Sequence, residues 1–218
     1  MRLRNIPGSE EVLENSNYVI NDPKKFKENW NTVFENKNPI YIEIGMGKGK
    51  FIVTLAKQNP EINFIGIEKY SSVLLRAVQK LQEEENDLRN LRLICIDAKE
   101  IEDVFGKEEI KKLYLNFSDP WPKDRHAKRR LTSKEFLKRY ESIIERNGLI
   151  EFKTDNTILF DFSLEEYKKS NWVLNAVSFD LHNDASLNRN NVMTEYETKF
   201  SQMGNPIFKM ILKLCREN

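Results

Sequence analysis

The chain lacks several features that mark other classes of protein. Its 218 residues include only two cysteines and two histidines. Two cysteines do not make the disulfide framework of a small secreted domain, and no His/Cys cluster has the spacing of a metal site. We therefore expect no metal. Cys95 and Cys215 lie in apolar, strand-like stretches, which favours buried free thiols.

Long hydrophobic runs are also missing. No apolar stretch approaches the ~20 residues needed to span a bilayer. The first five residues are not followed by the apolar core of a secretory signal. Internal repeats and linker-like segments are absent from the sequence as well. With 39% hydrophobic and 32% charged residues, the composition suits one soluble globular domain with a sizeable core, and we expect it in the cytoplasm.

Positive and negative charges are nearly equal in number, but they are unevenly distributed along the chain. The formal net charge is +1, while segment 123–130 holds five Lys or Arg residues against one Asp, a local charge of +4. The rest of the chain therefore carries about −3. A concentrated cationic patch on a nearly neutral chain predicts a localised site for a polyanion.

Glycine is scarce, with 8 in the chain, yet three of them alternate within Glu-Ile-Gly-Met-Gly-Lys-Gly (43–49). The apolar run 40–44 predicts a buried strand, and the apolar spacing within 51–56 predicts a helix. Strand, glycine turn and helix together open a nucleotide-binding α/β unit. The spacing fits neither a phosphate-binding P-loop nor a dinucleotide fingerprint, whose third glycine would replace Lys50. A turn without any ligand stays open at this point.

Strand and helix patterns alternate along the rest of the chain. We expect helices over 73–81 and 159–168, and further strands at 63–68, 91–97, 113–117, 149–155, 172–177 and 208–214. This alternation predicts an α/β fold with a doubly wound, mainly parallel sheet of seven strands. The last strand alternates apolar and polar residues, which suits an antiparallel edge position. Residues 1–38 are expected to form an extension that packs on a domain of residues 39–218.

Local signals predict where the other helices begin and end. Asp22-Pro23 has the pattern of an N-cap followed by proline. The helix after it would carry an apolar stripe of Phe26, Trp30, Val33 and Phe34. Thr132-x-x-Glu135 has the pattern of a capping box, and Gly148 is expected to end that helix as a C-cap.

Acidic residues stand at the ends of five expected strands: Glu43, Glu68, Asp97, Asp119 and Asp155. Ligands bind doubly wound sheets outside the carboxyl ends of the strands, so these acids should share one edge. Glu68 lies twenty-odd residues beyond the glycine turn, where a carboxylate can accept hydrogen bonds from both ribose hydroxyls. An acid at a strand end also occurs without a ligand, so the five acids together are stronger evidence for a ligand site than any one of them.

Taken together, these motifs resemble those of the bacterial tRNA (guanine-N7-)-methyltransferases. Segment 43–49 resembles the first motif of the wider class I S-adenosylmethionine-dependent superfamily. Asp-Pro-Trp-Pro-Lys (119–123) and Arg-His-Ala-Lys-Arg-Arg (125–130) are far more specific. Lys-Thr-Asp (153–155) and Thr-Glu-Tyr-Glu (194–197) match later motifs of the family. The resemblance extends from Glu43 to Phe208.

The resemblance implies a Rossmann-like methyltransferase sheet and methyl transfer from S-adenosylmethionine to N7 of a guanine in the variable loop of tRNA. It implies cofactor binding by Glu43, Gly45, Gly47, Glu68, Asp97 and Asp119, with Asp119 also catalytic. It implies substrate or RNA contacts by Lys123, Arg125, His126, Lys128, Arg129, Arg130, Asp155, Thr194, Glu195, Tyr196 and Glu197. Monomer and homodimer both stay open.

The chemistry asks little of the protein, because guanine N7 already has an in-plane lone pair and needs no deprotonation. We therefore expect Asp119 to act by orientation and charge. Pro120 and Pro122 bias Asp119 and Trp121 to extended backbone, and Trp121 could stack on a base or only pack.

Three other functions stay open. An exocyclic-amine methyltransferase carries a second proline where this chain has Trp121. The other two are a non-catalytic RNA-binding protein with the same fold and an NAD-dependent oxidoreductase, which Lys50 disfavours.

Overall fold

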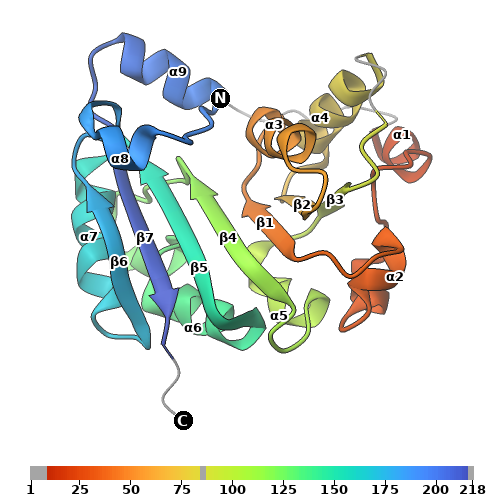
Figure 1. Cartoon of the computed structure of the whole chain (residues 1–218), viewed down its shortest axis with the longest axis horizontal. Coiled ribbons are helices and arrows are strands. Elements are labelled where there is room, and N and C mark those ends of the chain that lie inside the picture. The colour runs from red at the N-terminus through yellow and green to blue at the C-terminus, as the bar shows by residue number, and fades with distance from the viewer. Residues whose placement is uncertain (1–8, 84–86, 216–218) are drawn as a thin grey trace. The chain divides into compact units, whose positions relative to one another are not determined.

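The computed structural model describes residues 9–83 and 87–215 and divides the chain into two compact units (Figure 1). The first unit ends at Gly106 and the second begins at Lys107. Residues 1–8 of the expected N-terminal extension lie outside the described residues. The division into 1–38 and 39–218 stays a prediction.

The first unit alternates strands and helices around a parallel sheet of order β3-β2-β1. Its strands are β1 (Ile40–Ile44), β2 (Asn63–Glu68) and β3 (Leu91–Cys95). Its helices are α1 (Ser9–Glu14), α2 (Trp30–Phe34), α3 (Lys50–Gln58), α4 (Ser71–Glu83) and α5 (Ile101–Val104), with 3-10 turns at Pro23–Phe26 and Ala98–Glu100. The strands lie where the apolar runs predict them.

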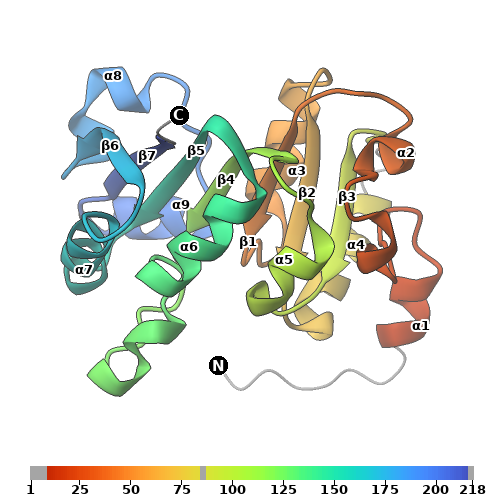
Figure 2. The same cartoon turned by 90° about the horizontal axis from the view of Figure 1, so that it is seen from below.

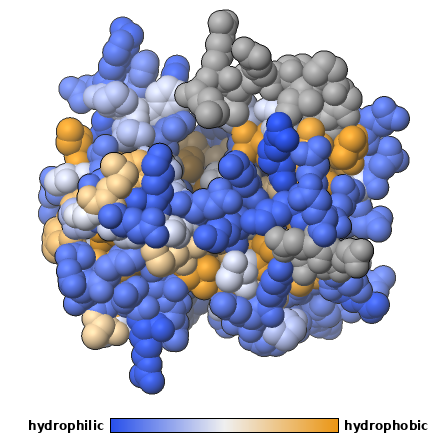
Figure 3. Space-filling view, turned by 90° about the horizontal axis from the view of Figure 1, so that it is seen from above, coloured by the Kyte–Doolittle hydropathy of each residue, from blue (hydrophilic) through white to orange (hydrophobic). Residues whose placement is uncertain are grey.

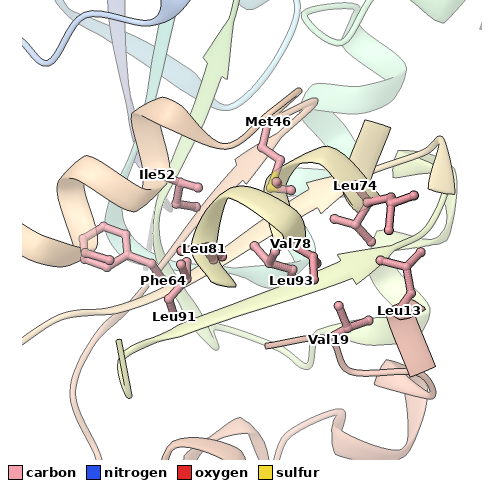
Figure 4. Packing of buried hydrophobic residues seen from close by; sticks show 13 residues of the cluster. Leu13, Val19, Met46, Ile52, Phe64, Leu74, Val78, Leu81, Leu91 and Leu93 are labelled. Atoms are coloured by element: carbon pink, nitrogen blue, oxygen red, sulfur yellow. The ribbon is translucent and has the colours of Figure 1, made fainter. Parts of the chain in front are cut away.

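An apolar layer joins α3 and α4 to β2 and β3 (Figure 4). Ile52 of α3 and Val78 of α4 are fully buried, as is Leu93 of β3. Burying such a side chain contributes about 1.5–3 kcal/mol. This packing fixes the turn between β1 and α3, which carries the alternating glycines.

The segment after Asp22 forms two short helical pieces rather than the one helix predicted. Left-handed backbone at Glu28, with φ 65°, separates the pieces. Trp30 is nevertheless fully buried, and its Nε1–H donates to the carbonyl of Val104 at 3.0 Å. The apolar stripe therefore packs on the core of this unit, although the continuous helix was wrong.

The second unit contains the strand order β4-β5-β7-β6. β4 (Ile110–Asn116) and β5 (Ile144–Thr154) are parallel, and β7 (Phe208–Leu214) is antiparallel to both β5 and β6 (Trp172–Ser178). Its helices are α6 (Lys134–Ile143), α7 (Thr157–Tyr167), α8 (Ala185–Asn188) and α9 (Glu195–Gln202), with 3-10 turns at Asp124–Arg129 and Leu181–Asn183. The sequence did not predict α8 or α9.

The order of all seven strands is β3-β2-β1-β4-β5-β7-β6. This order confirms the predicted seven-stranded, mainly parallel, Rossmann-like sheet with an antiparallel last strand. The edge position predicted for the last strand was wrong, because β7 pairs on both sides and β6 takes the edge.

The predicted capping box does not form. α6 begins at Lys134, and its N-cap Ser133 makes no side-chain cap bond. The carboxylate of Glu166 accepts from the Lys134 N–H at 2.9 Å instead. The Thr132 hydroxyl accepts from the Ser163 hydroxyl at 2.6 Å. A partner from α7 has thus replaced the local cap.

Two smaller predictions were also wrong. Gly148 lies within β5 and ends no helix, because α6 passes directly into β5 and the left-handed residue there is Asn147, with φ 67°. Cys95 and Cys215 are free thiols as predicted, but both are exposed. Cys95 is the last residue of β3 and Cys215 directly follows β7, where the strands leave the core.

The described surface is mainly polar. Hydrophilic side chains cover most of the face in Figure 3, and hydrophobic ones form small separate groups. Large exposed apolar side chains, such as Tyr70, Ile158 and Met203, lie far apart along the chain. Among the residues described, no helix is long and apolar enough to cross a bilayer.

The second unit's sheet has an apolar face and a charged one. α6 and α7 lie on the apolar face (Figure 2), where Phe152 of β5 stacks on Phe160 with ring centroids 6.2 Å apart. Successive side chains of a strand alternate between faces, so Glu151 lies on the other face. Its two carboxylate oxygens pair with Lys112 of β4 and Lys209 of β7, each at 2.8 Å.

This triad predicts acid sensitivity. Burial raises the pKa of Glu151, but the two lysines outweigh it and lower the pKa from 4.5 to about 2. A depressed folded-state pKa stabilises the fold above the unfolded value, and that stability is lost as the pH falls toward 2. Glu151→Gln should therefore lower the free energy of unfolding at pH 7 by roughly 3 kcal/mol.

The measurement is urea denaturation of wild type and variant between pH 7 and pH 2. The difference between the two proteins should shrink as the pH falls from about 4.5 to about 2. Glu145→Gln, at a half-buried site whose ion pair with Lys111 is 3.8 Å long, is the control and should cost less than about 1 kcal/mol. A constant difference across this pH range would contradict the assignment.

Candidate active-site residues

The alternating glycines leave backbone open at the carboxyl end of β1. Gly45 and Gly47 have φ of 77° and 57°, and a Cβ on either would meet no atom within 4 Å. The Gly45 N–H donates to the carbonyl of Ile67 at 2.8 Å. Left-handed backbone with open space above it suits the close approach of a ligand.

Glu68, the last residue of β2, holds this turn in place. It is 7% exposed, and its Oε2 accepts from the N–H of Gly47 at 3.2 Å. Its Oε1 accepts from the N–H of Lys69 at 2.9 Å and of Tyr70 at 3.1 Å. One carboxylate thus connects the glycine turn to the start of α4.

Asp97 lies two residues beyond β3 and is linked to Glu68 through Lys69. The Lys69 ammonium pairs with Asp97 Oδ2 at 2.7 Å, and the Lys99 N–H donates to Oδ1 at 3.0 Å. Burial raises the pKa of Asp97, but these two partners outweigh it and lower the pKa. Asp97 is therefore an ionised acceptor at neutral pH.

The first unit brings together the cofactor residues predicted within it. Glu43 is 1% exposed on β1, and β1, β2 and β3 are neighbouring parallel strands whose carboxyl ends lie at one edge. The open glycine backbone and the acceptors Glu68 and Asp97 fit a ligand with hydroxyl and amino groups. In the part of the chain described, no group of three His, Cys, Asp or Glu residues could hold a metal ion.

In the second unit, Asp119 is exposed and belongs to a segment with unusual backbone. Phe117 lies two residues before Asp119 and Trp121 two residues after it, and their φ angles are 50° and 41°. The extended backbone predicted for Trp121 was therefore wrong. Left-handed backbone in bulky residues costs of order 1–3 kcal/mol and needs support from its surroundings.

Arg130 provides that support. It is 4% exposed, and its guanidinium donates to the carbonyl of Pro120 at 3.0 Å and of Trp121 at 3.1 Å. The guanidinium also lies 4.2 Å from the ring centroid of Phe162. Sequence reasoning placed Arg130 among the RNA contacts, whereas the structure places it inside, holding the strained segment.

The other residues of the basic segment remain outside. Lys123, Arg125, Lys128 and Arg129 are exposed, and His126 is half-buried. The Trp121 ring contacts Arg129, 5.0 Å from its centroid, and His126 edge-on at 5.6 Å. Trp121 therefore packs against its own chain, and the exposed cations form the surface of this segment.

A second group gathers at the end of β5. Thr194 is the N-cap of α9 and accepts from the Glu197 N–H at 2.9 Å. Tyr196 is 46% exposed and its ring centroid lies 5.0 Å from that of Phe117. Burial and the negative charge of Asp155 raise the pKa of Tyr196. Asp155, Phe117 and Tyr196 are thus brought together, and Glu195 is exposed in the first turn of α9.

Glu197 differs from the other residues of its motif because its side chain is fully buried. Its Oε2 pairs with Lys153 of β5 at 2.6 Å. Its Oε1 accepts from Asn191 at 2.6 Å and lies 3.1 Å from Nε2 of His182. The sequence indicated none of these partners. Its only indication of a buried partner for Glu197 was that Lys153 lies within an apolar strand.

Known proteins resemble this chain along nearly its whole length. The family model described as "Putative methyltransferase" matches residues 37–210. The tRNA (guanine-N(7)-)-methyltransferase of Lachnoclostridium phytofermentans is 58% identical over 211 residues, covering 97% of both chains. The protein of the same name from Bacillus subtilis is 51% identical over 210 residues, covering 96% of this chain and 97% of its own.

Solved structures support the fold. The 16S rRNA methyltransferase KamB superposes with a TM-score of 0.66 at 12% identity, covering 87% of this chain and 94% of its own. At that identity the likeness concerns the fold alone.

Proposed function

We propose, from the premise that the chain belongs to the tRNA (guanine-N(7)-)-methyltransferase family, that it methylates N7 of a guanine in the variable loop of tRNA. The observation that carries the proposal is the identity of 58% over 97% of both chains. We further propose that the methyl donor is S-adenosylmethionine and that the enzyme acts in the cytoplasm, where tRNA is processed.

The experiment that tests this proposal is direct. The protein is incubated with labelled S-adenosylmethionine and bulk tRNA, and the digested product is identified by mass spectrometry. We expect 7-methylguanosine. A methyl group on an exocyclic nitrogen would support the exocyclic-amine alternative, and binding without transfer would support a non-catalytic RNA-binding protein. Neither alternative is favoured by the names of the relatives.

The first unit's residues fit the proposed cofactor. Glu68 would accept from the ribose hydroxyls and Asp97 from the adenine amino group, while the open backbone at Gly45 and Gly47 would admit the ligand. Glu43 would complete this edge as a further acid. S-adenosylmethionine supplies an electrophilic methyl group on a sulfonium, so no residue has to activate the donor.

The second unit's residues would bind and orient the guanine. Asp155, Thr194 and Tyr196 lie around the end of β5, where they would contact the substrate. Asp119 would place a negative charge near the base, which becomes cationic as N7 is methylated. Guanine N7 needs no proton removed, so alignment, worth up to roughly 7–11 kcal/mol in favourable cases, would carry most of the rate enhancement.

Glu68 allows a test of the cofactor site. Glu68→Ala should weaken S-adenosylmethionine binding by about 1–3 kcal/mol, because it leaves polar groups of the ligand without acceptors. Isothermal titration gives the affinity, and circular dichroism checks the fold. Glu61→Ala, which removes an exposed carboxylate from the same unit, is the matched control. Unchanged affinity in the Glu68 variant would remove this residue from the proposed site.

The exposed cations allow a test of RNA binding. Replacing Arg125 and Lys128 with Ala should lower the slope of log affinity against log salt by about 1–2 units, since each phosphate contact contributes about 0.7–0.9. The control replaces Lys37 and Lys138, two exposed lysines elsewhere. Cofactor affinity should not change in either variant. A slope equal to that of wild type would mean that the segment is only a solvated surface.

Asp119 allows a test of the chemistry. Asp119→Asn keeps the size of the side chain and removes its charge, so single-turnover methyl transfer should slow by ~10²-fold or more with saturating tRNA and cofactor. Asp119→Ala should slow it further, because orientation is lost as well. Asp124→Asn, an exposed acid in the next turn, should leave the rate unchanged.

The pH dependence separates charge from base catalysis. Guanine N7 needs no base, so raising the pH should not restore the rate of the Asn variant. A rate within about twofold of wild type would rule out the electrostatic role. Recovery at high pH would point to a base and support the exocyclic-amine alternative.

A further inference from the structure

An ion pair inside the second unit joins the two segments that carry the proposed substrate residues Asp155, Thr194 and Tyr196. Lys153 and Glu197 have no exposed side-chain surface, and their charged atoms are 2.6 Å apart. Lys153 is two residues before Asp155 on the same strand end. Glu197 directly follows Tyr196 in the first turn of α9.

We propose that Lys153 is a positioning residue that sets the place of Thr194 and Tyr196 beside Asp155 through Glu197, and that Glu197 itself does not contact the substrate. This inference rests on the proposed function. It changes the role that the sequence motif suggests for Glu197, from a binding group to an internal anchor.

The ammonium of Lys153 holds three points of one segment. It donates to the side-chain oxygen of Asn191 at 3.0 Å, to the carbonyl of Val192 at 2.9 Å and to Glu197 at 2.6 Å. These groups cover the connection into α9 and its first turn. A lysine has three N–H donors, and each reaches one of these acceptors. The segment is therefore fastened to β5 immediately before Asp155.

The carboxylate of Glu197 is already used on both oxygens. Oε2 pairs with Lys153, and Oε1 accepts from Asn191 and lies beside His182. The side chain of Glu197 has no exposed surface, so a base could reach it only if the covering segment opened and disturbed this buried, paired carboxylate, which is costly. Tyr196 and Thr194, by contrast, are exposed or half-buried and reachable.

The burial of the pair itself supports a positioning role. Removing two charges from water costs much of what their attraction returns, so a buried ion pair is weak evidence for stability. Such pairs are better attested as devices that select one arrangement. Burial lowers the pKa of Lys153, and this effect outweighs the opposite effect of the negative charge on Glu197. Keeping the ammonium charged in the interior therefore costs free energy. The arrangement that this pair would select is the one with Thr194 and Tyr196 beside Asp155.

The experiment compares Lys153→Met, Glu197→Gln and the double variant carrying both. Removal of one partner leaves a buried charge unpaired, whereas removal of both leaves none. Each single variant should therefore lower kcat/KM for tRNA at least tenfold, chiefly by raising KM for tRNA. The double variant should be no more impaired than the weaker single variant, because both substitutions remove the same anchor and their effects therefore do not multiply. The affinity for S-adenosylmethionine should stay within about twofold in all three.

Amide hydrogen exchange provides an arm that does not depend on activity. Residues 191–199 should lose protection in each single variant, and the double variant should lose no more than the single variants do. Asn191→Ala is a milder variant, because the ion pair stays and only its half-buried neighbour is removed. It should loosen the same segment and reduce kcat/KM for tRNA about three- to tenfold, which keeps the test usable if a single variant fails to fold.

Three results would overturn the proposal. A double variant whose loss equals the product of the two single losses would mean that Glu197 contacts the substrate independently of Lys153. Single variants with a lower melting temperature but unchanged kinetics below it would mean a purely structural role. Unchanged exchange of 191–199 in all variants would mean that the pair positions nothing. Failure of wild type to methylate tRNA would instead refute the proposed function, while the exchange arm still tests the anchor.

Discussion

A carboxylate removed from water is tolerated only where donors meet its oxygens, and this constraint organises both units. Glu68 accepts from the backbone N–H groups of Gly47, Lys69 and Tyr70. Glu151 pairs with lysines of the two neighbouring strands, whereas Glu197 of α9 pairs with Lys153 of β5 and accepts from Asn191. Each carboxylate joins segments that are distant in sequence. Glu68 thereby fixes the glycine turn and Glu197 the first turn of α9, both of which carry proposed binding residues, while Glu151 joins three strands of the sheet.

The same logic applies to a buried cation. Near Asp119, Trp121 departs from the extended backbone that Pro122 favours, and Phe117 also adopts left-handed φ. Backbone strain of this kind persists only where the surroundings over-determine it. The guanidinium of Arg130 meets two carbonyls of this segment, and a charged donor makes each of these bonds stronger than a neutral one. Arg130, from the most basic stretch of the chain, is therefore buried, whereas its cationic neighbours are exposed, as the proposed RNA binding requires.

The sequence predicted those features whose causes are local. Apolar runs placed the strands, and acids such as Glu68 and Asp97 could be placed at strand ends because a strand end is visible in the pattern. The capping box at Thr132 failed because Glu166, from another helix, serves the same N–H group. The roles of Arg130 and Lys153 were hidden for a similar reason. A lysine in an apolar strand indicates only that some partner exists, and the partner, Glu197, lies 44 residues away along the chain. Substrate contacts by Asp155 and Tyr196 stay predictions.

The division between exposed and buried charge suits the proposed chemistry. Methyl transfer to guanine N7 needs neither a general base nor an activated nucleophile, so the protein's contribution is to hold the base and to favour its developing positive charge. The rate of methyl transfer is sensitive to small displacements of the groups that hold the base, and loops are the most easily displaced parts of a fold. Buried ion pairs that take no part in the reaction can therefore set its rate, because they decide where the reacting groups stand. In the proposed reaction Asp119 acts on the base and must be accessible, as its exposed position allows, whereas the buried Lys153, Glu197 and Arg130 would act only by positioning other residues.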